Sequence, residues 1–138
     1  MDNQLIQAKL ESIRRCMRRI EETRPSSVTA LQSNQDQQDI LVLNLSRAIQ
    51  LCVDIGSHLI SESEQQAPTT MGEAFIRLQD LGVLDAELAT KLRKAVGFRN
   101  IAVHSYQDID WAIVYAICTK DLDDFKSFSR AIANHCQI

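Results

Sequence analysis

Apolar residues recur with a helical period along almost the whole chain. In the first segment they advance in steps of four and three residues, at Ile6, Leu10, Ile13, Met17 and Ile20. This spacing predicts a helix with one apolar face. The helix ends at Arg24, because the residue before Pro25 is disfavoured in the α conformation. The polar residues 26–38 predict a loop with room for one extra helical turn.

A second helix is predicted over residues 39–61. One apolar seam follows it, and further apolar residues spread well beyond that seam. The seam holds Leu41, Leu45, Ala48, Cys52, Ile55 and Leu59, and the others are Ile40, Val42, Leu43, Ile49 and Val53. A helix that is apolar on most sides is buried on most sides, so we expect it at the centre of the fold. Residues 62–68 predict a polar linker.

Capping residues mark the next two helices. Thr70 and Glu73 have the spacing of a capping box, in which both side chains satisfy free backbone N–H groups at a helix start. Gly82 suits the C-terminal cap of this short third helix. Asp85 can cap a fourth helix that continues towards Val103.

The fifth helix begins near Asp108 or Asp110 and carries apolar residues at helical spacing, namely Trp111, Val114, Cys118, Leu122, Phe125 and Ile132. No segment shows the period-two alternation of a β-strand. Five helices joined by short loops predict an all-α antiparallel bundle that forms one domain over residues 1–138.

Composition supports this fold class and limits the function. The chain has 138 residues, of which 45% are apolar and 5% aromatic, with 4 Gly and 2 Pro. These values argue against a disordered chain and against a turn-rich β fold. The net charge of −3 argues against a protein that coats nucleic acid through bulk charge, yet it leaves room for a local basic site.

Neither a secretory signal nor a membrane span is evident. No apolar run approaches the roughly 18 residues that cross a bilayer, so we expect a soluble cytoplasmic protein without membrane association. The four cysteines lie far apart, with no C-x-x-C pair and no matching histidines. They predict buried thiols rather than a zinc site, and we expect no metal.

Charged residues cluster by helix. The basic clusters are Arg14, Arg15, Arg18 and Arg19 in the first helix and Lys91, Arg93, Lys94 and Arg99 in the fourth, whereas the fifth opens with Asp108, Asp110, Asp121, Asp123 and Asp124. Two interpretations stand side by side. The clusters are solvated helix surfaces, or they form a phosphate-facing strip beside an acidic strip that docks a partner.

Residues 97–106 differ from ordinary helix surface. The apolar seam of the fourth helix, continued by steps of four and three, passes through Arg99 and Tyr106. A core-facing guanidinium needs a carboxylate, a phosphate or a partner chain. In a regular helix His104 points about 140° away from Arg99. The two could meet at one substrate only if the helix ended early or a second subunit contributed.

These side chains also have structural explanations. Arg99 could pair with Asp54 of the second helix, His104 could be an ordinary surface or core group, and Tyr106 could be an interface aromatic. Asn100 and His104, one turn apart, share a face. On the residues alone, this stretch is a candidate phosphate site.

Arg99-Asn100-x-x-x-His104-x-Tyr106 resembles the R-x4-H-x-Y motif of HepT-like proteins, the toxin branch of the HEPN superfamily. The resemblance extends over most of the chain, through Asn44-Leu45-x-x-Ala48-Ile49, Asp54, Pro68, Phe75-x-x-Leu78 and Gly97-Phe98. It implies a compact helical bundle that forms a homodimer, in which two motifs face a shared cleft.

The resemblance implies a metal-independent endoribonuclease, the toxin of a type VII HepT/MntA-like toxin–antitoxin system. Arg99 would hold the scissile phosphate, and His104 would act as general base or acid. Asn100 and Asp54 would support them, Asp54 by positioning Arg99. The chain itself would use no cofactor.

The resemblance also implies a partner, a small MntA-like nucleotidyltransferase antitoxin that uses ATP to transfer AMP onto Tyr106. Either the acidic run of the fifth helix or the arginines of the first would dock it. The alternative is a non-catalytic helical protein that binds nucleotide or a partner nucleotidyltransferase. The acidic total charge favours this alternative slightly, and the intact motif favours the nuclease more. A purely structural bundle leaves Arg99 on an apolar seam unexplained.

Overall fold

The computed structural model describes residues 3–138, and the regular elements of that part are all helical. They are α1 (Asn3–Thr23), α2 (Val28–Gln32), α3 (Gln35–Ser61), α4 (Met71–Asp80), α5 (Ala86–His104), the 3₁₀ turn η1 (Tyr106–Asp108), α6 (Trp111–Ala116), the π-helical segment η2 (Ile117–Asp121) and α7 (Asp123–Cys136). The expected all-α class is confirmed.

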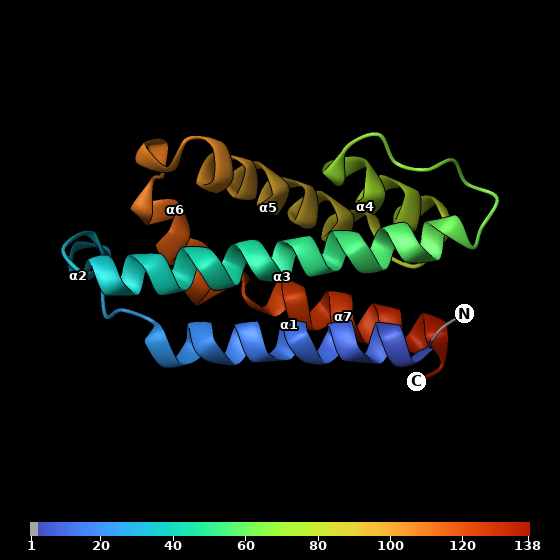
Figure 1. Cartoon of the computed structure of the whole chain (residues 1–138), viewed down its shortest axis with the longest axis horizontal. Coiled ribbons are helices and arrows are strands. Elements are labelled where there is room, and N and C mark those ends of the chain that lie inside the picture. Colours follow the sequence, from blue (N-terminus) through green and yellow to red (C-terminus); the bar gives the residue numbers. More distant parts are fainter. Residues whose placement is uncertain (1–2) are drawn as a thin grey trace.

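The long helix α3 forms the centre of an antiparallel bundle (Figure 1). It packs against α1 on one side and against α4 and α5 on the other, while α7 contacts both α1 and α5. One hydrophobic core joins these helices, with Phe75 and Phe128 in edge-to-face contact at 6.2 Å between ring centroids. The end of α5 lies at the same end of the bundle as α2, α6 and the start of α3, and both termini lie at the opposite end.

Residues 26–38 contain more helix than the expected loop. The Ser27 side chain accepts a hydrogen bond from Ala30 N (3.0 Å) and starts α2, and Asn34 accepts one from Gln37 N (3.0 Å) and starts α3. Leu31 is completely buried and anchors α2 to the core. Short polar side chains at these two caps compensate for the low apolar content of the segment.

The predicted caps of α4 and α5 are largely confirmed. Thr70 and Asp85 are the N-caps of α4 and α5. The carboxylate of Glu73, however, reaches the hydroxyl of Thr69 (2.6 Å) rather than Thr70, so the reciprocal half of the capping box is displaced by one residue. Gly82 has φ +77° directly after the C-cap Leu81, which gives the left-handed turn of a Schellman motif.

The predicted fifth helix is interrupted. It comprises α6, the wider π-helical turn of η2, and α7. The buried residues Val114, Cys118 and Leu122 follow one another in two steps of four, which is longer than the α-helical period of 3.6. A π turn takes up the difference and keeps all three side chains in the core.

The helix α3 is long and apolar enough to cross a membrane by length and composition alone. In this fold it is the core helix, because α1, α2, α4 and α5 cover it and its residues Leu41, Leu45, Cys52 and Ile55 are fully buried. All four cysteines are buried free thiols, as the sequence predicted.

Candidate active site

The helix α5 stays regular through the whole R-x4-H stretch. The N–H of Ser105 still donates to the carbonyl oxygen of Ile101 at 2.8 Å, so the α-helical pattern continues to His104. Phe98 and Ala102 point into the core. Arg99 and His104 therefore lie on helix faces about 140° apart. An early end of the helix, which was one of the two ways to bring them together, does not occur.

Arg99 is partly buried between α5 and α3. Its Nη2 donates to Gln50 Oε1 at 3.2 Å, and Gln50 Nε2 donates to Asp54 Oδ1 at 2.9 Å. A direct pairing of Arg99 with Asp54, one of the structural explanations for Arg99, is not found among residues 3–138, because Gln50, one turn before Asp54 on α3, bonds to both side chains. Asp54 reaches Arg99 only through this amide, and its other oxygen lies 3.9 Å from Lys9 Nζ.

Asn100 and His104 are both solvent-exposed. They lie one turn apart on the outer side of α5 and present an amide and an imidazole to solvent. This arrangement leaves the His104 imidazole accessible from solvent.

Tyr106 lies just beyond α5, in η1, and not on the seam of the helix. The chain leaves the helix at Ser105 so that Ile109 can enter the core and Asp110 can cap α6 through Ala112 N (2.9 Å). The Tyr106 ring is 41% exposed and meets the Trp111 ring at an angle of 67°. Tyr106 is therefore partly open to solvent.

The Tyr106 hydroxyl donates to Asp39 Oδ1 at 2.9 Å, which ties η1 to the start of α3. Burial of the ring, and next the hydrogen bond to Asp39, raise the pKa of Tyr106 to about 12. The phenol is neutral at physiological pH and holds its proton against Asp39.

Large apolar side chains are exposed beside this site. Leu43 is 48% exposed and Val103 is 53% exposed. On α3, Leu43 lies between Asp39 and Gln50. On the facing segment, Val103 lies between Arg99 of α5 and Tyr106 of η1. Exposed apolar side chains this close to the R-x4-H stretch are typical of a contact surface for another molecule.

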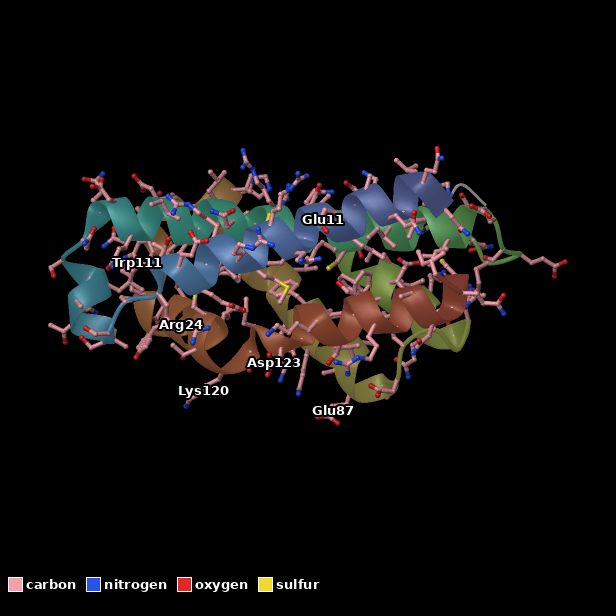
Figure 2. All side chains as sticks on the ribbon, turned by 90° about the horizontal axis from the view of Figure 1, so that it is seen from below. Glu11, Arg24, Glu87, Trp111, Lys120 and Asp123 are labelled. Carbon is pink, nitrogen blue, oxygen red and sulfur yellow. The ribbon has the colours of Figure 1, made fainter. Side chains whose placement is uncertain are left out.

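The charge clusters are partly structural. Arg14 and Arg19 pair with neighbouring glutamates on α1, as in a solvated helix surface. In the acidic run, Asp110 caps α6, Asp123 lies 3.7 Å from Lys126, and Asp124 lies 3.7 Å from Lys91. Lys120, the basic residue next to Asp121, projects away from the helices (Figure 2). Three of the five aspartates in the acidic run thus have partners within the chain.

Two residues of the site escaped the sequence analysis, Gln50 and Asp39. Both face α5 and η1 from α3, and their partners lie 49 and 67 residues away along the chain. The one available signal was that Gln50 precedes Asp54 by one helical turn. In residues 3–138 no group of three His, Cys, Asp or Glu side chains is placed to hold a metal ion.

Comparisons with known proteins match almost the whole chain. A family model described as "Ribonuclease HepT-like" matches residues 13–132. The mRNA nuclease HepT of Shewanella oneidensis is 32% identical, over 91% of this chain and 94% of that protein. The tRNA nuclease HepT of Aphanizomenon flos-aquae is 30% identical, over 95% of this chain and 89% of that protein.

Among solved structures, the chain is similar to the tri-AMPylated HEPN toxin of Shewanella oneidensis in complex with an MNT antitoxin. The TM-score is 0.89 at 30% identity, and the match covers 97% of this chain and 99% of that chain. A structure of a toxin–antitoxin with AMP-PNP matches with a TM-score of 0.87, also at 30% identity, and covers 96% of this chain and 99% of that chain.

Proposed function

Because the chain belongs to the HepT-like ribonuclease family, we propose that it is an endoribonuclease, the toxin of a type VII HepT/MntA-like toxin–antitoxin system. The observation that carries this proposal is the complete R-x4-H motif at the end of α5, with Arg99 fixed by Gln50 and His104 open to solvent. The chain acts as one domain in the cytoplasm, where its RNA substrate is.

Cleavage proceeds by attack of the ribose 2′-OH on the adjacent phosphorus. The bond from phosphorus to the 2′ oxygen forms as the bond to the leaving 5′ oxygen breaks. His104 accepts the 2′-OH proton or donates a proton to the 5′ oxygen. Arg99 binds the phosphate and stabilises its added negative charge. Asn100 orients His104 or the phosphate, and Asp54 positions Arg99 through Gln50. The chain needs no metal or cofactor for these steps.

A homodimer completes the site. Arg99 and His104 of one chain point about 140° apart, so a substrate held by one Arg99 meets the other chain's histidine more readily. The exposed Leu43 and Val103 provide an apolar contact surface beside the motif. Two such chains bring two motifs to one shared cleft.

Regulation acts through Tyr106. An MntA-like nucleotidyltransferase antitoxin transfers AMP from ATP: the phenolic oxygen bonds to the α-phosphorus, the α–β anhydride bond breaks, and pyrophosphate and the phenolic proton leave. ATP is used by the antitoxin and not by this chain. The AMP phosphodiester carries negative charge beside Arg99 and His104, so it competes with the RNA backbone.

Cleavage of RNA in the presence of a chelator tests this function. The wild type is expected to cut, and His104→Ala and Arg99→Ala are expected to lose most of the activity. His135→Ala is the matched control, since it removes an exposed imidazole from the far end of α7. Equal cleavage by all four proteins contradicts the nuclease, and an inactive wild type that binds nucleotide or the antitoxin supports the non-catalytic alternative.

A further inference from the structure

A cavity of about 550 Å³ opens between α1 and α3, adjacent to the candidate active site. Its polar lining residues include Ser12 and Arg15 from α1 and Asn44, Arg47 and Gln50 from α3. Gln50 is the residue that accepts the hydrogen bond of Arg99. The cavity and the catalytic guanidinium therefore share a wall.

Two arginines line this cavity, one from each helix. Both Arg47 and Arg15 act electrostatically on the thiol of Cys16, which also lines the cavity, so both positive charges lie close to it. Burial raises the pKa of Cys16, and the two arginines oppose that rise.

In the part of the chain that the structure describes, neither guanidinium group has a carboxylate partner. None of the ion pairs in residues 3–138 includes Arg15 or Arg47. The Arg15 guanidinium donates to the Ser12 hydroxyl of its own helix, at 3.1 Å. Asp54 lies in the same wall, but it accepts from Gln50 and lies near Lys9. By contrast Arg14, one residue away, pairs with Glu11 at 3.5 Å and lines a separate groove between α1 and α7.

From this arrangement we infer that the α1–α3 cavity is an RNA-backbone subsite, in which Arg15 and Arg47 bind phosphates next to the one held by Arg99. The inference rests on the proposed function. Guanidinium groups without carboxylate partners are suited to bind phosphate oxygens through paired N–H donors. Arg47 follows Leu43 by one helical turn, so the subsite leads towards the apolar face where the two chains meet. The chain has few aromatic residues, so its binding of RNA relies on contacts with phosphates rather than on base stacking.

The test measures binding of a fluorescein-labelled single-stranded RNA of mixed sequence, in the His104→Ala background so that the RNA stays intact. Arg15→Gln and Arg47→Gln are compared with Arg14→Gln over a range of salt concentrations. Each of the first two is expected to weaken binding and to lower the slope of log Kd against log salt by about 0.7. Arg14→Gln is expected to leave both unchanged.

Several results overturn the subsite. If all three variants bind like their parent while the protein with His104 intact cleaves RNA, the subsite is wrong and the nuclease stands. If the protein with His104 intact neither binds nor cleaves RNA, the proposed function fails and the subsite with it. Sedimentation of Arg47→Gln supplies the last check: a change from dimer to monomer assigns Arg47 to the interface between chains instead.

Discussion

Arg99 of α5 is held against α3 by Gln50, whose amide donates in turn to Asp54. A free arginine side chain samples many conformations, and this hydrogen bond restricts it before RNA arrives. The amide, not the carboxylate, makes the direct contact. In the proposed mechanism Gln50 is therefore a positioning residue, and Asp54 would act through it.

Gln50→Leu is expected to reduce RNA cleavage about ten- to hundredfold, because the lost hydrogen bond joins a charged group and is worth about 1.5–3 kcal/mol. Asp54→Asn keeps an oxygen for the Gln50 amide and should cost less. Single-turnover cleavage measures both. Since positioning acts on the reacting geometry, the loss should appear in the rate at saturating enzyme. If Gln50→Leu cleaves RNA at the wild-type rate, Gln50 has no positioning role.

Burial contributes most to the raised pKa of Tyr106, and Asp39 contributes the rest. Asp39→Asn is therefore expected to lower that pKa from about 12 part of the way towards the ordinary value near 10, because the amide lacks the negative charge that holds the phenolic proton. Ultraviolet titration checks this in a Tyr115→Phe background, which leaves one tyrosine. An unchanged midpoint means that burial alone sets the pKa.

The same shift has a consequence for stability. The folded state binds the Tyr106 proton more tightly than the unfolded state, so its contribution is complete below pH 10 and is lost as the pH rises from 10 to about 12. Tyr106→Phe should show a flatter decline of the unfolding free energy over that interval. Parallel curves for the two proteins contradict the expectation.

Co-expression with the cognate nucleotidyltransferase is expected to increase the intact mass by one or more AMP units. Tyr106→Phe lacks the acceptor oxygen and should stay unmodified, whereas Tyr115→Phe, the matched control, should be modified normally. Intact-protein mass spectrometry reads both. If Tyr106→Phe still gains the mass of AMP, the modified residue is not Tyr106.

Two glycines should respond oppositely to alanine. Gly82 has φ +77°, so Gly82→Ala is expected to cost about 1 kcal/mol of stability. Gly97 lies inside α5 with nothing within 4 Å of an added Cβ, so Gly97→Ala should stabilise by about 0.5–1 kcal/mol. Urea unfolding measures both, and effects of the same sign contradict the backbone argument.

The sequence predicted local features better than contacts between helices. Apolar spacing identified the main helices, and Thr70, Asp85 and Gly82 marked their ends. The start of α3 was missed because Asn34 begins a polar, exposed turn in which apolar periodicity gives no signal. Asp39 and Gln50 were missed for a different reason. Their contacts with Tyr106 and Arg99 depend on how α3 and α5 are aligned along their lengths, and no local pattern specifies that alignment.

The most direct test of a cleft shared by two chains mixes two inactive variants. Arg99→Ala and His104→Ala are co-refolded and assayed for RNA cleavage in chelator. If each site takes Arg99 from one chain and His104 from the other, mixed dimers contain one intact site, and roughly a quarter of wild-type activity returns on random pairing. A mixture no more active than either variant alone contradicts the shared site.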